Sequence, residues 1–176
     1  LYNDLSRVVP GANDNLSGTF ISMAIAKHLR EAGVELQHTE IGVASLGSEE
    51  AGIRGAKVFA AAHRDELGGP ETFVVVIDTI RDCAHFKIYD KDLNGTVKGD
   101  AELSRRIHDA GQRCGIELPS ATLIPGSSDS AAFTQAGWRA VALAAMDPRP
   151  AAYYHTRLDD WDNMNEACVG KAIEVV

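Results

Sequence analysis

The segment Ala44-Ser45-Leu46-Gly47-Ser48-Glu49-Glu50-Ala51-Gly52 joins an apolar run of the chain to a predicted helix. The run that it ends, Ile41 to Leu46, is typical of a strand, and a Gly-Ser turn separates it from two adjacent glutamates, Glu49 and Glu50. Ser48 is suited to cap the helix, whose positive N-terminal end favours carboxylates in the first turn. This structural role would explain the glutamates by itself, so a chemical role depends on which other residues lie near them.

Three other polar residues are predicted at the end of a strand or in an adjoining turn: Asp14, Asp78 and His155. Asp78 directly follows the apolar run Phe73–Ile77, so its carboxylate is partly desolvated and needs a cation or several hydrogen-bond donors. Asp14 precedes a helix, and an Asx turn or a helix cap is the favoured explanation of this residue taken by itself. Because α/β folds place their sites at strand ends, these residues are expected to lie close to the glutamates.

Length and composition describe an ordinary globular chain. Its 176 residues match one domain, and the apolar fraction of 45% and charged fraction of 24% are average for such proteins. No segment approaches the roughly 18 to 20 apolar residues that a membrane-spanning helix needs. The net charge of −8 argues against nucleic acid or an anionic membrane as the partner.

Strand-like and helical patterns alternate along the chain. Helices are predicted over 17–31, 50–67, 101–114 and 128–136 and from about 165, and strands over 36–46, 73–77, 86–89, 121–124 and 140–144. This alternation predicts an α/β sandwich with a largely parallel sheet. No linker or repeat divides the chain, so residues 1–176 are expected to form a single domain.

Asp14, one of the paired glutamates, Asp78 and His155 would together form a mixed oxygen and nitrogen site. This donor set suits zinc, and a carboxylate that bridges two ions would allow a two-metal site. The other glutamate, held beside the metal, could take a proton from bound water and pass it to a leaving amine. The residues alone therefore indicate either a metal hydrolase or an α/β domain of another function.

Four segments of the chain, in this order, can be compared with the motifs of a known family. They are Pro10-Gly11-Ala12-Asn13-Asp14-Asn15-Leu16-Ser17-Gly18, Gly47-Ser48-Glu49-Glu50-Ala51-Gly52-Ile53-Arg54-Gly55, Ser128-Asp129 followed by Phe133, and Tyr153-Tyr154-His155-Thr156 with Asp159 and Asp162-Asn163. Together they resemble the co-catalytic zinc aminopeptidase family (metallopeptidase family twenty-eight, clan MH) of bacterial leucyl aminopeptidases. The resemblance extends across nearly the whole chain, and four motifs in sequence are far more specific than any one.

The resemblance implies a fold and a set of metal ligands. The fold would be the three-layer sandwich of the phosphorylase/hydrolase-like zinc exopeptidases, with helices on both faces of a mostly parallel mixed sheet. Asp14 matches the carboxylate that bridges two zinc ions, Glu50 and His155 match ligands of one ion, and Asp78 matches a ligand of the other. Two zinc ions are therefore expected in a full-length protein of this kind.

The resemblance also implies catalytic roles and a substrate. Glu49 matches the general base, and Tyr154 matches a tyrosine that hydrogen-bonds the tetrahedral intermediate in some members. Asp159 is expected to accept a hydrogen bond from His155 and to orient its ring. The implied substrate is a peptide with a free N-terminus. Side-chain preference, a carboxypeptidase or dipeptidase variant, oligomeric state and compartment stay open.

One motif of the family is missing. Members carry His-x-Asp shortly before the bridging aspartate, and its histidine ligates the ion that Asp78 binds. A gapless match would put Tyr2-Asn3-Asp4 there, and alternatively the true motif precedes Leu1. We favour the second reading, in which the chain is an N-terminally truncated piece of a longer one. Ser130 stands where many members have histidine, a variable position that we do not count as a ligand.

A zinc-dependent aminopeptidase is the function expected from these features. One alternative is the related glutaminyl cyclase chemistry, which works with one zinc, because Asp14, Glu50 and His155 form a complete one-ion set. The other alternative is a non-catalytic binding or dimerisation module, as in transferrin-receptor-like relatives that have lost their metal ligands. Retention of Glu49, Glu50 and His155 together argues against that loss.

Overall fold

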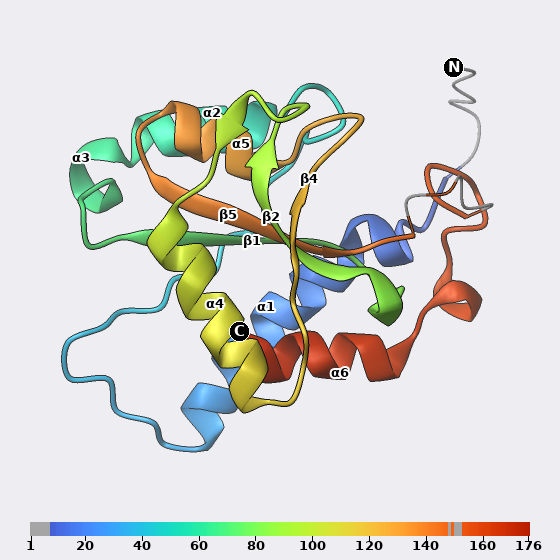
Figure 1. Ribbon diagram of the computed structural model, residues 1–176, viewed down its shortest axis with the longest axis horizontal. Coiled ribbons are helices and arrows are strands. Elements are labelled where there is room, and N and C mark those ends of the chain that lie inside the picture. The colour runs from blue at the N-terminus through green and yellow to red at the C-terminus, as the bar shows by residue number, and fades with distance from the viewer. Residues whose placement is uncertain (1–7, 148, 150–152) are drawn as a thin grey trace.

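A computed structural model of the chain describes residues 8–147, 149 and 153–176, so Tyr2-Asn3-Asp4 lie outside the described residues. Figure 1 shows a sheet between two groups of helices. The helices are η1 (Ala12–Ser17), α1 (Gly18–Glu31), α2 (Arg54–Ala62), α3 (Arg64–Leu67), η2 (Cys83–His85), α4 (Ala101–Arg113), α5 (Asp129–Gln135), η3 (Trp161–Asn163) and α6 (Glu166–Val175). The strands are β1 (Phe73–Ile80), β2 (Phe86–Asp92), β3 (Val97–Lys98), β4 (Ser120–Thr122) and β5 (Arg139–Ala145).

The sheet is mixed, with the order β1-β5-β2-β3, and β4 also pairs with β2. β1 and β5 form the longest pair, which is parallel and runs from Phe73 opposite Arg139 to Ile80 opposite Ala145. β2 is antiparallel to β5 and parallel to β4. Most of the paired residues of the sheet therefore lie in parallel strands, as the alternation of strands and helices predicts.

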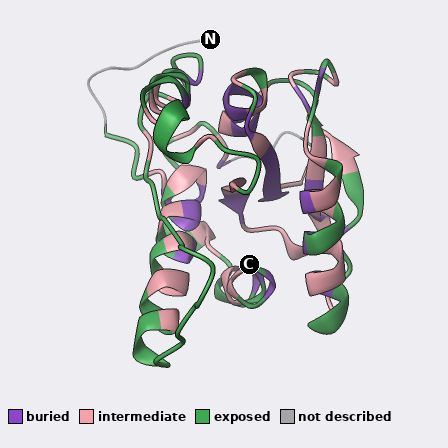
Figure 2. Cartoon of the chain, turned by 90° about the vertical axis from the view of Figure 1, so that its left-hand side faces the viewer, coloured by how far each residue is buried: buried purple, intermediate pink, exposed green. Residues whose placement is uncertain are grey.

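Side chains alternate along β1 between two hydrophobic clusters, because successive residues of a strand point to opposite faces of a sheet. Val75 and Ile77 belong to a cluster with residues of α1, α4 and α6, whereas Val74 and Val76 pack into a cluster with residues of α2 and α5. Figure 2 shows the buried residues lying mainly between the helices and the sheet. The predicted three-layer sandwich is therefore confirmed, with helices on both faces.

The strand predicted over residues 36–46 is wrong. Residues 39–48 have no regular secondary structure, and the side chains of Ile41 and Val43 are 48% and 44% exposed. Among the described residues, β1 pairs only with β5, so its other edge is not paired with residues 36–46. A strand needs the backbone of a neighbour for its hydrogen bonds, and β-propensity cannot replace that neighbour.

The helix predicted from Glu50 begins later than expected, at Arg54. Residues 48–52 form a turn in which the backbone N–H groups of Gly52 and Ile53 donate to the carbonyl oxygen of Glu49. Ser48 and Ile53 both have left-handed backbone conformations, with φ of 60° and 52°. Ser48 is therefore not the helix cap, and the two glutamates lie in a tight turn before α2. Nowhere in the described part of the chain is a helix long and apolar enough to cross a membrane.

Candidate metal centre

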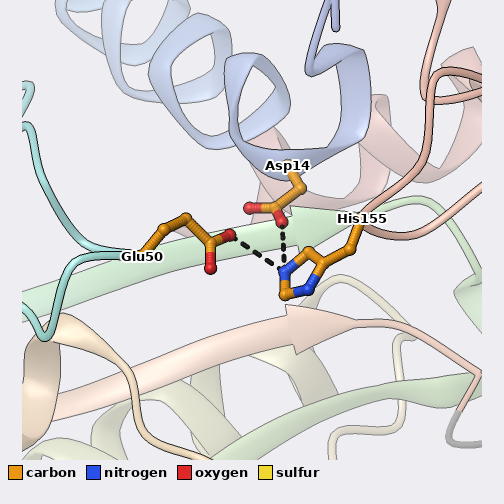
Figure 3. A group of neighbouring side chains, drawn as sticks. All are labelled: Asp14, Glu50 and His155. Atoms are coloured by element: carbon orange, nitrogen blue, oxygen red, sulfur yellow. Dashed lines mark ion pairs between the residues drawn. The ribbon is translucent and has the colours of Figure 1, made fainter. Parts of the chain in front are cut away.

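Asp14, Glu50 and His155 come together from three distant parts of the chain. Nε2 of His155 lies 3.1 Å from Oδ2 of Asp14 and 2.9 Å from Oε1 of Glu50. Their possible ligand atoms all lie within 4.8 Å of one another. Figure 3 shows both carboxylates pointing at the imidazole above the sheet strands. The group offers two oxygen ligands and one nitrogen ligand for a single cation, a set that zinc accepts.

The loop that carries Asp14 is held by Asp159, which lies in the same loop as His155 and is 2% exposed. The backbone N–H of Asn13 donates to Oδ1 of Asp159 at 2.8 Å, and that of Asp14 donates to Oδ2 at 2.9 Å. Both carboxylate oxygens of Asp159 accept these backbone hydrogen bonds, and its expected role in orienting His155 stays a prediction. Asp159 therefore fixes Asp14 relative to the His155 loop.

Asn15 and Gly18 tie the other side of this loop to the end of β1. The Asn15 amide donates to the carbonyl oxygen of Ile77 at 2.9 Å, and the Gly18 N–H donates to Oδ1 of Asn15 at 2.9 Å. A Cβ atom at Gly18 would lie 2.1 Å from the Ile77 oxygen, so no other residue fits there without a shift. Asp14 thus sits directly against the strand that carries Asp78.

The position of Asp78 differs slightly from the prediction. Asp78 lies inside β1, opposite Ala144, and the register between β1 and β5 shifts just after it. Its Oδ1 atom is closed to solvent and has no donor among the described residues. Burial, followed by the charges of Asp14 and Glu49, raises the pKa of Asp78 well above its usual range. Asp78 does not belong to the group of Asp14, Glu50 and His155. Its buried Oδ1 atom, which has no hydrogen-bond donor among the described residues, is nevertheless suited to bind a cation.

The carboxylates of the site repel one another in the absence of a cation. Burial, and after it the charge of Glu50, raises the pKa of Glu49 to about 7. Burial and Glu50 also raise the pKa of Asp14. Asp14 is 15% exposed, whereas Glu50 and His155 are 63% and 44% exposed. The site is therefore open to solvent on the side of Glu50 and His155, from which a substrate can approach.

Tyr154 stacks on His155, with their ring centroids 3.9 Å apart and the planes inclined by 22°. Burial, and after it the charge of Asp14, raises the pKa of Tyr154 above its usual value, so the phenol keeps its proton at neutral pH. His155 has a left-handed backbone with φ of 57°, a conformation that is uncommon outside glycine and often found at functional sites. Tyr154 is thus a hydrogen-bond donor beside a candidate metal ligand.

Two acidic residues near the site were given no role in the sequence. Asp129 is the first residue of α5, and its charge raises the pKa of both Glu49 and Asp78. Asp92 is 2% exposed and accepts hydrogen bonds from the hydroxyls of Ser128 and Ser130. The motif Ser128-Asp129 is the only sequence signal for Asp129. Asp92 lies beyond the predicted strand 86–89, in a predicted turn where an aspartate is ordinary, so the sequence gives no signal for it.

Comparisons with known proteins agree with one another. The model of Peptidase family M28 matches residues 3–176. A zinc aminopeptidase from Bacillus subtilis is 24% identical with a TM-score of 0.75, LapB from Legionella pneumophila is 19% identical with a TM-score of 0.82, and an aminopeptidase from Aneurinibacillus sp. strain AM-1 is 20% identical with a TM-score of 0.72. Each match covers 95% of this chain. The chain spans 41%, 45% and 38% of those structures, in that order, which is less than half of each.

Proposed function

The chain belongs to peptidase family M28, a family of metallo-aminopeptidases, and from this premise we propose that it is a zinc-dependent exopeptidase that hydrolyses the N-terminal bond of peptides. The observation that carries the proposal is the convergence of Asp14, Glu50 and His155 within 4.8 Å. Their donor set suits zinc, and the site opens to solvent where a peptide would enter.

Asp14, Glu50 and His155 would hold one zinc ion, and Asp14 and Asp78 would contribute to a second. Zinc bound there would acidify water and polarise the scissile carbonyl. Burial, and after it repulsion between the carboxylates, raises the pKa of Glu49 and Asp78, and a cation relieves that repulsion. The same charges that destabilise the metal-free site therefore favour metal binding.

Glu49 would act as the general base. It is adjacent to the ligand Glu50 without belonging to the three-residue group, so its carboxylate is free to accept a proton from the attacking water. The same carboxyl group then donates that proton to the leaving amine. Tyr154 would donate a hydrogen bond to the oxyanion that develops on the scissile carbonyl, a role for which its phenol must stay protonated.

Glu49→Gln tests this proposal. The substitution keeps the size of the side chain and removes the base, so zinc binding should persist while hydrolysis of L-leucyl-p-nitroanilide falls by about 100-fold or more. Zinc content is measured by atomic absorption and hydrolysis by release of nitroaniline. Glu66→Gln is the matched control, because Glu66 is exposed and pairs only with His63 among the described residues. Full activity of the Glu49→Gln chain would refute the assignment of the base.

A glutaminyl cyclase-like function is the second candidate, since Asp78 lies outside the group that Asp14, Glu50 and His155 form. That chemistry needs one zinc ion, whereas the aminopeptidase proposal expects two in the full-length protein. Zinc counted at saturation in that protein, with cyclisation of an N-terminal glutaminyl peptide as the parallel assay, separates the two. A chain that binds no zinc would instead support the non-catalytic module.

A further inference from the structure

Arg81 and Asp82 directly follow β1, the strand that carries Asp78. Their backbone N–H groups both donate to the carbonyl oxygen of Ala145, the last residue of β5, at 3.1 Å and 2.5 Å. Their side chains are 26% and 18% exposed and form an ion pair. The fold thus holds two charged side chains firmly at the end of the β1–β5 pair, and neither belongs to the three-residue group of the metal centre.

Asp82 uses both of its carboxylate oxygens to hold other parts of the chain. Oδ1 accepts from Nη1 of Arg81 at 2.5 Å, whereas Oδ2 accepts from the hydroxyl of Tyr153 at 2.5 Å and from the backbone N–H of Asp147 at 3.0 Å. The ring of Tyr153 also lies against the guanidinium of Arg81, whose Cζ atom is 4.1 Å from the ring centroid. Tyr153 is only 6% exposed. Since it precedes His155 by two residues, these contacts fix the chain just before a candidate ligand.

Arg81 holds the chain on the other side of the same loop. Its Nε–H donates to the carbonyl oxygen of Asn163, the last residue of η3. The side-chain amide of Asn163 in turn donates to the carbonyl oxygen of Leu158 at 2.6 Å. Loop 153–163, which lies between β5 and α6 in the chain (Figure 1), is therefore attached to the end of β1 at both of its ends.

The short turn at the start of this loop extends the attachment to His155. The backbone N–H and the hydroxyl of Thr156 donate to the carbonyl oxygen of Tyr153 at 3.0 Å and 2.8 Å. His155 lies inside this turn with a left-handed backbone, so its place follows from that of Tyr153. The imidazole side chain is 44% exposed, so packing alone does not fix it. The backbone of the loop must therefore direct Nε2 of His155 towards the two carboxylates of the metal centre.

The attachment of loop 153–163 matters for an ion, because a ligand that is already in place binds more tightly than one that must first be ordered. Through Asp159 the loop also holds the backbone of Asp14, so its attachment places two of the three candidate ligands. Residues that orient metal ligands from behind typically contribute about 10- to 100-fold to metal affinity or activity. Arg81 and Asp82 have the contacts that such a role requires.

We propose that Arg81 and Asp82 position His155 for metal binding, by holding both ends of loop 153–163 at the end of β1. This inference deepens the proposed function and rests on it for the identity of the ion. The two residues touch neither the ion nor the substrate in this role, so they are positioning residues. β1 would then serve both proposed ion sites, because it also carries Asp78.

The first test measures zinc affinity of the chain by competition with a chromophoric chelator. Tyr153→Phe keeps the ring against Arg81 and removes only the hydroxyl that donates to Asp82, so it should weaken zinc binding about ten-fold. Asp82→Asn removes the charge as well and should weaken zinc binding at least as much. Tyr89→Phe in β2 is the matched control, since the Tyr89 hydroxyl makes no hydrogen bond to any described residue, and it should leave zinc affinity unchanged.

The second test asks whether these residues act through one another. Tyr153→Phe combined with Asp82→Asn should weaken zinc binding no more than the stronger single variant, because both remove the same contact. Arg81→Met should weaken it too, and Arg81→Lys, which keeps the charge beside Asp82, should restore part of the affinity. In the metal-free chain, amide hydrogen exchange should become faster in loop 153–163 of each weakened variant and stay unchanged in β2.

Unchanged zinc affinity in Tyr153→Phe and Asp82→Asn would overturn the inference, and if Asp82→Asn does not fold, Tyr153→Phe alone decides. Losses that add in the double variant would also overturn it, as would faster exchange in β2, which would make the role a general structural one. Failure of the proposed function is a separate outcome. A wild-type chain whose variants lose zinc affinity as expected, but which does not hydrolyse the anilide, would refute the peptidase and keep the positioning role.

Discussion

Two apolar runs of this chain lead to acidic residues of the site, and only one of them is built into the sheet. Phe73–Ile77 forms most of β1, which pairs with β5, and leads directly to Asp78 in the same strand. Ile41–Leu46 leads to Glu49 and Glu50 but lies in an irregular segment whose alternate side chains are about half exposed. The two runs also differ in composition, because the first consists only of large apolar residues whereas the second includes Gly42, Ala44 and Ser45.

The comparison teaches that the site has a rigid side and a locally held side. Asp78 is positioned by the register of two parallel strands and by two hydrophobic clusters. Glu49 and Glu50 are positioned by a tight turn, in which Ile53 N–H donates to the Glu49 carbonyl and Gly55 N–H donates to that of Gly47. A perturbation of the first side should affect the whole fold, whereas a perturbation of the second should affect mainly metal binding.

Gly18→Ala and Gly55→Ala apply the same change to the two sides. A Cβ at Gly18 would lie 2.1 Å from the Ile77 oxygen, and one at Gly55 would lie 2.2 Å from the Gly47 oxygen. Gly18→Ala should lower the free energy of unfolding by about 3 kcal/mol or more, because the end of β1 cannot move. Gly55→Ala should lower it by less than about 1 kcal/mol and weaken zinc binding roughly ten-fold, because the unpaired segment can shift and takes the glutamates with it.

Urea unfolding and zinc titration measure both effects. Gly170→Ala in α6 is the control, since a Cβ there meets no atom within 4 Å. It should stabilise the chain by roughly 0.5 to 1 kcal/mol, as expected for glycine in a helix. Equal losses of stability in the Gly18 and Gly55 variants would show that the two sides are held alike.

Leu143→Ala and Ile41→Ala compare the packing of the two regions directly. Leu143, in β5, is fully buried, so its truncation should cost about 2 to 5 kcal/mol in the free energy of unfolding. Ile41 is 48% exposed and belongs to neither hydrophobic cluster, so its truncation should cost about 0.5 kcal/mol or less. Urea midpoints of the two variants give the values. A large cost at Ile41 would mean that residues 39–47 are packed in solution.

A dependence of stability on pH is also expected. Burial and neighbouring carboxylates raise the pKa of Glu49 to about 7 and the pKa of Asp78 well above its usual value, so the folded metal-free chain holds protons that the unfolded chain releases near pH 4. Their contribution to stability is therefore largest below about pH 4 and is lost as the pH rises through about 7. Zinc should reverse this trend, because it replaces the protons.

Melting temperatures at pH 5 and pH 7.5, with a chelator and with zinc, test this dependence. Asp78→Asn should flatten the profile of the metal-free chain more than Glu49→Gln does, because Asp78 is the more deeply buried of the two. If Glu49→Gln flattened the pH profile more than Asp78→Asn, the stronger repulsion between carboxylates would lie on the side of Glu49 and Glu50. A metal-free chain that becomes more stable between pH 5 and 7.5 would contradict the direction of both pKa shifts.

Much of the fold could be predicted because its local signals and its packing agree. The run 73–77 and the helix from about 17 to 31 have the expected apolar spacing, and the run packs on both faces while the helix packs on one. The run 36–46 has a strand's composition, but whether a neighbouring backbone is present cannot be seen in the run itself. The helix α2 starts later than predicted because a turn precedes it. That turn, with its left-handed Ser48, depends on the close approach of Gly47 and Gly55, which the sequence does not show.

The candidate site was predicted in part. That Asp14, Glu50 and His155 would meet followed from their places at strand ends and from the family motifs, and the structure brings them together; their roles stay predictions. The contacts of Asp159 and Asp92 could not be predicted. Each depends on hydrogen bonds between residues far apart in the chain, which leave no periodic pattern in the sequence.

The hydrogen bonds from Asn13 and Asp14 to Asp159 have a consequence for how the protein is made. Asp14 is synthesised 145 residues before Asp159, the carboxylate that holds its loop. Until the segment with His155 and Asp159 has left the ribosome, Asp14 has neither that anchor nor the imidazole, so the three-residue group cannot capture an ion before then.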